Sequence, residues 1–127
     1  MLAGVPDSLP ALIKANRIQE KARNIGFDWE TREQVWDKVK EEIEEVEQEL
    51  KSGVQNNIEE EFGDLLFSII NAARLYGVNP DNALEKTNKK FIKRFNYLEC
   101  KAKEMGKSLK EMSLNEMDQI WEEAKKH

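Results

Sequence analysis

Two pairs of carboxylates on consecutive helical segments are the residues of this sequence best suited to chemistry. The first pair is Glu42 and Glu45, preceded by Glu41, and the second, after a spacer of 15 residues, is Glu61 and Asp64. A spacing of three residues keeps both members of a pair near one side of a helix, which turns about 100° per residue. Two antiparallel helices joined by a short turn could bring the pairs together. Four oxygen-rich ligands of this kind suit a hard cation such as Mg²⁺ or Mn²⁺.

The second helical segment is the more informative of the two. Residues 62–73 are nearly all apolar or small, so this helix is expected to be buried on several sides, where a carboxylate is costly unless it is paired or binds a metal. Gly63 is expected to let a neighbouring helix come close to Glu61 and Asp64. The competing interpretation, strongest for residues 41–49, is an ordinary solvated face, which is the usual role of Glu-rich helices.

A second group of polar residues lies on the fourth predicted helix. Lys90 and Arg94 are four residues apart and flank its apolar side, with Asn88 nearer that side. Cations beside a metal–carboxylate cluster indicate phosphate binding, with lysine acting as a point charge and arginine as a fork. An ordinary basic helix face explains the same two residues equally well.

Helical periodicity predicts an all-α protein without strands. Two capping-box patterns, Thr31 with Gln34 and Ser113 with Glu116, mark helix starts, and Ser8 is expected to cap the first helix. Trp36, Phe91 and Phe95 are expected to help fill the core. The predicted architecture is a four-helix bundle with an additional short C-terminal helix, in one domain covering residues 1–127. The predicted helices follow Ser8 to about residue 25, then span 32–52, 55–76, about 80–105, and a short stretch after Ser113.

Composition narrows the classes of function. The chain has 127 residues, of which 35% are charged and 39% hydrophobic, and a net charge of −5, so general affinity for nucleic acid is not expected. Cys100 is the single cysteine, which excludes an intrachain disulfide and a zinc–cysteine site. No membrane association is expected, because no apolar run approaches transmembrane length and no secretion signal is evident. The expected location is the cytoplasm. The predicted third helix is apolar over more than one face, which favours a homodimer.

The motif Glu41-Glu42-x-x-Glu45, a spacer, and Glu61-x-x-Asp64 resembles the defining motif of the all-α nucleoside triphosphate pyrophosphohydrolases. The similarity is closest to the MazG branch, and within it to the second repeat of full-length MazG proteins. It extends over nearly the whole chain. Further segments that carry it are Gly4-Val5-Pro6, Gln19-Glu20-Lys21, Gly26-Phe27-Asp28-Trp29, Asn88-x-Lys90-Phe91-x-x-Arg94-Phe95 and Trp121.

This resemblance implies hydrolysis of a nucleoside triphosphate between its α- and β-phosphates, giving a monophosphate and pyrophosphate. It also implies dimers with sites assembled near the subunit interface. Glu41 matches the leading glutamate of the motif; it or Glu45 would take a proton from the attacking water. The residues that match the family's Mg²⁺ ligands are Glu42, Glu45, Glu61 and Asp64. Lys90 and Arg94 match positions near the triphosphate; Lys38, Lys125 and Asn88 are further candidates for substrate binding.

Two other classes of protein compete with this interpretation. A di-iron or di-manganese carboxylate bundle usually needs Glu-x-x-His pairs, whereas the only histidine here is the terminal His127. A helical interaction module, or a relative that binds nucleotides without hydrolysis, would keep the helices and lack turnover. Candidate contacts to the base of a nucleotide are Phe27, Trp29, Asn71 and Trp121.

Overall fold

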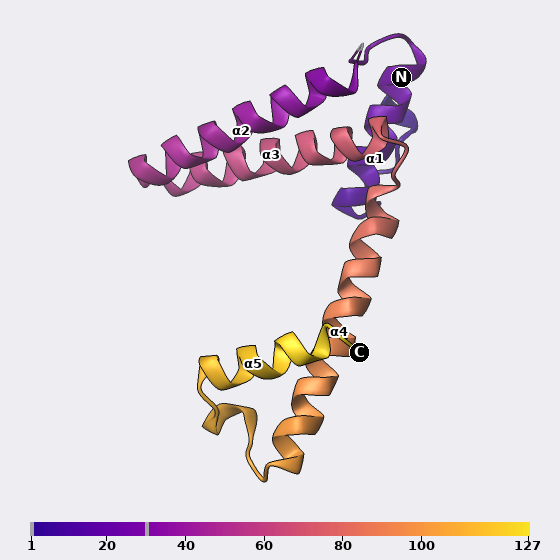
Figure 1. Ribbon diagram of the computed structural model, residues 1–127. Helices are drawn as coiled ribbons and strands as arrows, with labels where there is room; N and C mark the ends of the chain where they lie inside the picture. The colour runs from indigo at the N-terminus through magenta and orange to yellow at the C-terminus, as the bar shows by residue number, and fades with distance from the viewer. Residues whose placement is uncertain (1, 30) are drawn as a thin grey trace. The chain divides into compact units, whose positions relative to one another are not determined.

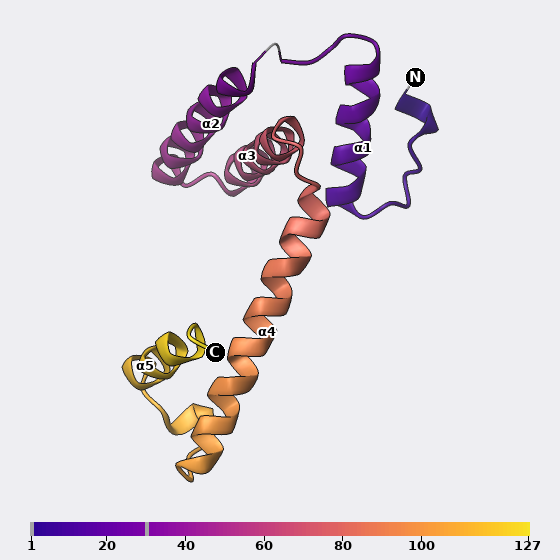
Figure 2. The same ribbon diagram turned by 45° about the vertical axis from the view of Figure 1, so that its right-hand side comes forward.

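The chain folds into helices joined by short connections, as a computed structural model that describes residues 2–29 and 31–127 shows (Figures 1 and 2). The described residues contain no strand, which confirms the all-α prediction and the short C-terminal helix. The elements in chain order are the 3-10 helix η1 (Leu2–Gly4), α1 (Ala11–Asn24), α2 (Arg32–Ser52), α3 (Gln55–Leu75), α4 (Pro80–Glu104), the 3-10 helix η2 (Leu109–Glu111) and α5 (Leu114–Ala124). They fall into two compact units, residues 1–81 and 82–127, which are described separately.

The first unit is built around an antiparallel pair of helices, α2 and α3 (Figure 2). The predicted capping box is present at the start of α2: the Thr31 side chain accepts from the backbone N–H of Gln34, and the Gln34 side chain accepts from the backbone N–H of Thr31. The helix ends at Gly53, whose φ of 74° lies in the left-handed region that glycine adopts without strain. After the turn that follows, α3 runs back along α2. This antiparallel arrangement is the one that can bring the two pairs of carboxylates together.

Apolar side chains hold this pair together. Val35 and Val39 of α2 are buried against Ala72 of α3, with Leu65 and Leu75 packed beside them. Helix α1 packs on another side of α3. Helix α3 is therefore covered by α2 and by α1 on separate sides.

The start of α1 differs from the prediction. The helix begins at Ala11, its N-cap residue is Pro10 with an extended ψ of 145°, and no side chain caps it. Ser8 thus lies outside the helix, because the backbone becomes helical only after Pro10, whose carbonyl accepts the first helical hydrogen bond from Lys14. The other predicted helix boundaries agree with the structure to within a residue or two.

The second unit consists of most of α4, together with η2 and α5. Its core contains Leu98 and Ala102 of α4, Met112, and Ile120 of α5. The predicted Ser113–Glu116 capping box starts α5. In this unit the ring of Phe91 contacts that of Trp121, with ring centroids 5.1 Å apart.

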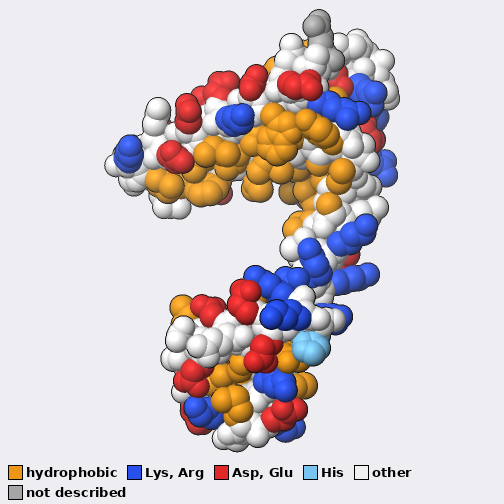
Figure 3. Space-filling model, in the orientation of Figure 1, with side chains coloured by type: hydrophobic (Ala, Val, Ile, Leu, Met, Phe, Trp, Pro, Cys, Tyr) orange, Lys and Arg blue, Asp and Glu red, His pale blue; other side chains and the backbone are white. Residues whose placement is uncertain are grey.

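Several large apolar side chains lie at the surface. Trp36, Phe91 and Phe95 were expected in the core, but they are exposed by 46%, 57% and 38%, because the buried positions around them are taken by smaller residues such as Val35 and Leu98. On α3, Phe62, Leu66 and Ile69 are also exposed; they form one stripe at helical spacing. Figure 3 shows hydrophobic side chains gathered along the α2–α3 pair. None of the helices in the described part of the chain is long and apolar enough to span a membrane.

The expectation for Gly63 was wrong within the first unit. A Cβ atom built at this position would meet nothing within 4 Å, so no neighbouring helix approaches it. The arc of α3 on which Gly63 lies is turned away from α2, because α2 packs on the opposite arc through Leu65 and Ala72.

Candidate metal centre

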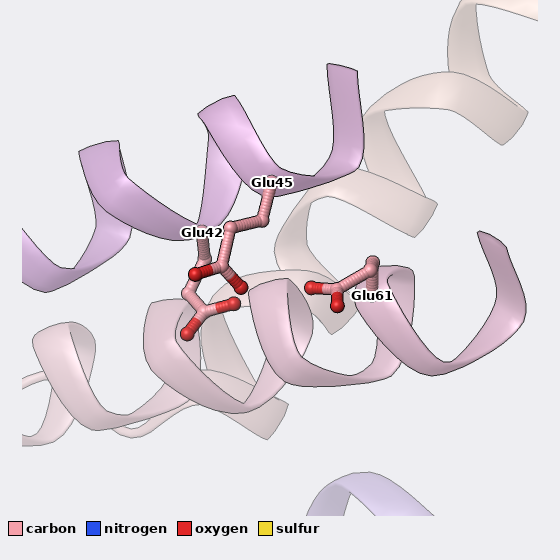
Figure 4. Close-up of side chains that lie close together, drawn as sticks. All are labelled: Glu42, Glu45 and Glu61. Atoms are coloured by element: carbon pink, nitrogen blue, oxygen red, sulfur yellow. The ribbon is translucent and has the colours of Figure 1, made fainter. Parts of the chain in front are cut away.

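Three glutamates from the two paired helices form an acidic cluster, as predicted. Glu42 and Glu45 come from α2 and Glu61 comes from α3, and one carboxylate oxygen from each lies within 4.8 Å of the other two. Figure 4 shows the carboxylates turned toward one another across the two helices. Glu42 is buried, and Glu45 and Glu61 are partly buried. The α2–α3 turn places them together because Glu45 and Glu61 are nearly equidistant from Gly53.

The cluster is electrostatically unfavourable without a cation. The pKa of Glu61 is raised above its ordinary value of 4.5, first by desolvation, then by hydrogen bonding with Glu45 and by the negative charges of Glu45, Asp64 and Glu42. A site that forces like charges together raises the free energy of the ionised form. A cation among these carboxylates would reverse that effect.

Unpaired oxygen atoms show that the donor set fits a metal ion. Glu42 Oε2 and Glu61 Oε2 are buried and have no hydrogen-bond partner among the described residues. Buried carboxylate oxygens without a partner are costly, and coordination of a hard divalent cation would satisfy them. Glu42, Glu45 and Glu61 therefore have the chemistry of a metal centre.

Two other predicted residues, Lys38 and Glu41, lie beside the cluster. The Nζ atom of Lys38 donates to Glu42 Oε1 at 2.8 Å and lies 3.6 Å from Glu41 Oε1. The pKa of Lys38 is raised, chiefly by the hydrogen bond to Glu42. Lys38 thus neutralises part of the acidic charge, and only one oxygen of Glu42 is left for another ligand. The Glu41 side chain is more than half exposed and is not part of the cluster.

The remaining predicted site residues are less closely associated with it. Asp64 is exposed and lies one helical turn beyond Glu61, on whose pKa its charge acts; it is not one of the three clustered acids. Asn88, Lys90, Arg94 and Lys125 belong to the second unit. Of these, Asn88, Lys90 and Lys125 are exposed and Arg94 is partly buried.

A pocket in the first unit contains residues to which sequence analysis gave no role. It has a volume of about 520 Å³ and lies where α1, the segment after it and α3 meet. Phe27, Trp29 and Asn71, named above as candidate base contacts, line it together with Gln19, Asp28 and Arg74. The segments around Gln19 and Asp28 resemble the family in sequence, and this resemblance was the signal that could have pointed to the pocket. Their contacts with α3 span more than 40 residues, so no local sequence pattern predicts these contacts.

These features define an all-α protein with a cluster of carboxylates, suited to a metal ion, in a helical hairpin. Residues 30–98 match the model of the MazG nucleotide pyrophosphohydrolase domain. The match covers more than half of the chain, and the chain belongs to this family.

Two curated relatives are similar along almost the whole sequence, and a third is similar along just over half of it. The nucleoside triphosphate pyrophosphohydrolase/pyrophosphatase MazG of Thermotoga maritima is 44% identical over 117 residues, which cover 92% of this chain and 45% of the relative. The nucleoside triphosphate pyrophosphohydrolase of Escherichia coli K12 is 42% identical over 127 residues, 98% of this chain and 48% of the relative. The uncharacterized protein YabN of Bacillus subtilis is 51% identical over 71 residues, covering 56% of this chain and 14% of that protein. The chain spans about half the length of the first two relatives.

Proposed function

We propose that this chain hydrolyses nucleoside triphosphates to nucleoside monophosphates and pyrophosphate with the help of Mg²⁺, and that Mn²⁺ can substitute. The observation that carries the proposal is the cluster of Glu42, Glu45 and Glu61 with two buried carboxylate oxygens unpartnered. Membership of the MazG family supports the reaction, as do the names of the Thermotoga maritima and Escherichia coli relatives, about half of whose length this chain spans.

The cluster residues and Asp64 would hold the cation. When bound, Mg²⁺ supplies charge neutralisation at the phosphates and makes water more acidic. Asp64 is the fourth acid of this proposed set, and its negative charge helps to raise the pKa of Glu61.

The protein's own groups divide the remaining work. A water oxygen attacks the α-phosphorus, the bond from that phosphorus to the bridging oxygen breaks, and pyrophosphate leaves with the bond's electrons. Glu45, or Glu41 beside it, takes the proton from the water. Lys90 and Arg94 stabilise the leaving pyrophosphate, Lys38 and Lys125 add positive charge, and Asn88 supports the site.

The assembly that we propose is a homodimer of single-domain chains, each domain covering residues 1–127. The exposed stripe of Phe62, Leu66 and Ile69 on α3 supports it, because soluble monomers rarely expose contiguous large apolar patches. A cytoplasmic location is proposed on two grounds: the substrates are nucleoside triphosphates, and the single cysteine, Cys100, is exposed and unpaired.

The experiment that tests the function is pyrophosphate release from a panel of canonical and modified nucleoside triphosphates, with Mg²⁺ and with EDTA. We expect Mg²⁺-dependent formation of monophosphate and pyrophosphate, and its loss in Glu61→Gln while the variant remains folded. Glu60→Gln, with an exposed neighbour outside the cluster, is the matched control and should keep wild-type turnover.

The alternative function is a non-catalytic nucleotide-binding or helical interaction module. It would be favoured if the folded wild-type protein released pyrophosphate from no triphosphate in the panel. In that case Mg²⁺-dependent nucleotide binding, measured by calorimetry, would separate a nucleotide-binding module from a purely helical interaction module.

A further inference from the structure

The ion pair between Lys38 and Glu42 joins the acidic cluster to the solvent side of α2. The two residues are four positions apart, so their side chains meet on one face of the helix. Lys38 Nζ donates to Glu42 Oε1 at 2.8 Å and lies 3.6 Å from Glu41 Oε1. The Lys38 side chain is 36% exposed, whereas that of Glu42 is only 7% exposed. Lys38 therefore reaches from the surface to a carboxylate that is enclosed by the protein.

The two oxygens of Glu42 have different surroundings. Oε1 accepts the hydrogen bond from Lys38, and Oε2 is buried without a hydrogen-bond partner among the described residues. A charge-assisted hydrogen bond is roughly twice as strong as a neutral one, and burial leaves the carboxylate little room to rotate. Oε2 is thus the one oxygen of Glu42 that a cation can take without displacing Lys38.

Lys38 does not remove the need for a cation at the cluster. One ammonium group faces three clustered carboxylates, those of Glu42, Glu45 and Glu61. Negative charge therefore remains among them, and Glu61 Oε2 is buried without a partner in the described part of the chain. The effect of Lys38 is on the number of oxygens that the cluster can offer, because it occupies one that would otherwise be free.

The number of available oxygens distinguishes Mg²⁺ from Ca²⁺. Ca²⁺ takes about six to eight oxygen ligands in flexible arrangements and often binds both oxygens of one carboxylate. Mg²⁺ requires a nearly ideal octahedron and usually keeps several water molecules, so it needs few protein oxygens. A buried carboxylate with one oxygen held by lysine can coordinate only through the other, which suits Mg²⁺.

We propose that Lys38 determines the cation selectivity of the acidic cluster: it restricts Glu42 to one coordinating oxygen and thereby favours Mg²⁺ over Ca²⁺. Lys38 is a positioning residue in this role, because it acts on the cation through Glu42. The inference rests on the proposed function, which places a cation at the cluster. It is separate from any contact between Lys38 and phosphate, since selectivity is measured without nucleotide.

The test compares two variants of Lys38 with a matched control. Lys38→Met removes the charge and the hydrogen-bond donor but keeps an unbranched stem. Lys38→Gln removes the same charge and keeps an N–H donor, and glutamine can bond to an acidic side chain four residues further along a helix. Lys40→Met is the control, because Lys40 is exposed on α2 and projects about 200° around the helix from Lys38.

The quantity measured is the ratio of the affinities for Ca²⁺ and Mg²⁺, each titrated alone by isothermal calorimetry. Loss of a positive charge strengthens the binding of both cations alike, because they carry the same charge, so the ratio reports the coordination. Lys38→Met should raise the ratio of Ca²⁺ to Mg²⁺ affinity about tenfold, the low end of the change that follows the loss of a hydrogen-bond partner of a metal ligand. Lys38→Gln and Lys40→Met should keep the wild-type ratio.

Thermal unfolding in EDTA gives a second measurement. Lys38→Met should melt below the wild type, because Glu42 stays buried after it has lost its partner, and Lys40→Met should not. The wild type itself should bind Mg²⁺ more tightly than Ca²⁺. Tighter binding of Ca²⁺ to the wild type would overturn the inference even if Lys38→Met did not fold.

Three outcomes separate this inference from the proposed function. An unchanged ratio in folded Lys38→Met, or the same change in Lys38→Gln and Lys38→Met, would overturn the role of the hydrogen bond and leave Mg²⁺-dependent hydrolysis standing. A ratio that depends on the donor in a wild type without pyrophosphate release would support the role of Lys38, although the proposed function would fail. A folded wild type that binds neither cation would overturn both.

Discussion

The ion pair between Asp28 and Arg74 ties the segment after α1 to helix α3, and breaking it tests whether this contact holds the first unit and its pocket together. The side chains of Arg74 and Asp28 are only 7% and 14% exposed. Asp28→Asn keeps the size of the side chain and one acceptor oxygen, but it removes the charge. The Arg74 guanidinium is then left buried without its counterion.

The expected loss is about 2–3 kcal/mol in the free energy of unfolding. Removing one partner of a fully buried pair costs roughly 3–5 kcal/mol. The loss here should fall just below that range, because Asp28 is partly accessible and Asn retains an acceptor. For a chain of this size, the loss corresponds to a melting temperature lower by roughly 10 °C.

The effect should depend on pH in one direction. Hydrogen bonding with Arg74 lowers the pKa of Asp28 below its ordinary value of 3.8, with further help from the Trp29 N–H and from Arg23. A lowered pKa stabilises the folded protein fully above the ordinary value, and the contribution disappears as the pH falls through the lowered one. The difference between wild type and Asp28→Asn should therefore be largest at neutral pH and shrink below pH 3.8.

The assay is urea unfolding at several pH values, followed by circular dichroism. Asp7→Asn is the matched control, because Asp7 pairs with Lys14 at 3.2 Å but its side chain is fully exposed; we expect no measurable change there. A loss below about 0.5 kcal/mol at neutral pH in Asp28→Asn, no larger than a surface substitution produces, would refute the assignment of this pair as a structural tie.

Three further predictions follow from the cluster and from α3. Glu61→Gln should raise the melting temperature without Mg²⁺ above pH 4.5, because the raised pKa of Glu61 means that its ionisation destabilises the fold as the pH rises. The substitution should also abolish the increase in melting temperature that Mg²⁺ gives the wild type. A variant that melts below the wild type in EDTA would contradict the acidic cluster. Leu66→Glu should convert a dimer into monomers in light scattering, whereas Leu114→Glu, which is 71% exposed on α5, should not; a monomeric wild type would count against the dimer. Gly63→Ala should stabilise the chain by about 0.5–1 kcal/mol in urea unfolding, since nothing lies near the new Cβ; a loss of similar size would show that another chain packs there.

Local signals in the sequence predicted the part of the fold that forms the acidic cluster. The Thr31–Gln34 capping box and Gly53 define both ends of α2, and the short turn then fixes how α3 returns along it. With these bounds known, the positions of Glu42, Glu45 and Glu61 follow from helix geometry. Their clustering could therefore be predicted from spacing, without any knowledge of long-range contacts.

Features that depend on tertiary contacts could not be predicted in this way. The pairing of Lys38 with Glu42 is a choice of rotamer at helical spacing, and the sequence made Lys38 a further candidate for substrate binding. The pocket needs Gln19 to reach Phe67 and Asp28 to reach Arg74, contacts that depend on how α1 packs on α3. Ser8 matched a capping pattern, but the extended ψ of Pro10 delays the helix.

Helix α3 has three sides with different neighbours, and their angular order follows from its sequence. At about 100° per residue, Glu61 lies within about 40° of Leu65 and Ala72, which pack against α2, so the ligand oxygens lie at a helix–helix contact where water is scarce. Phe67, Asn71 and Arg74 lie on the side toward α1 and the pocket. Asp64 falls between these two sides. Phe62, Leu66 and Ile69 occupy the third side, which is exposed. A charge introduced on the third side should thus impair assembly alone, whereas one near Leu65 should disturb the hairpin and the metal centre together.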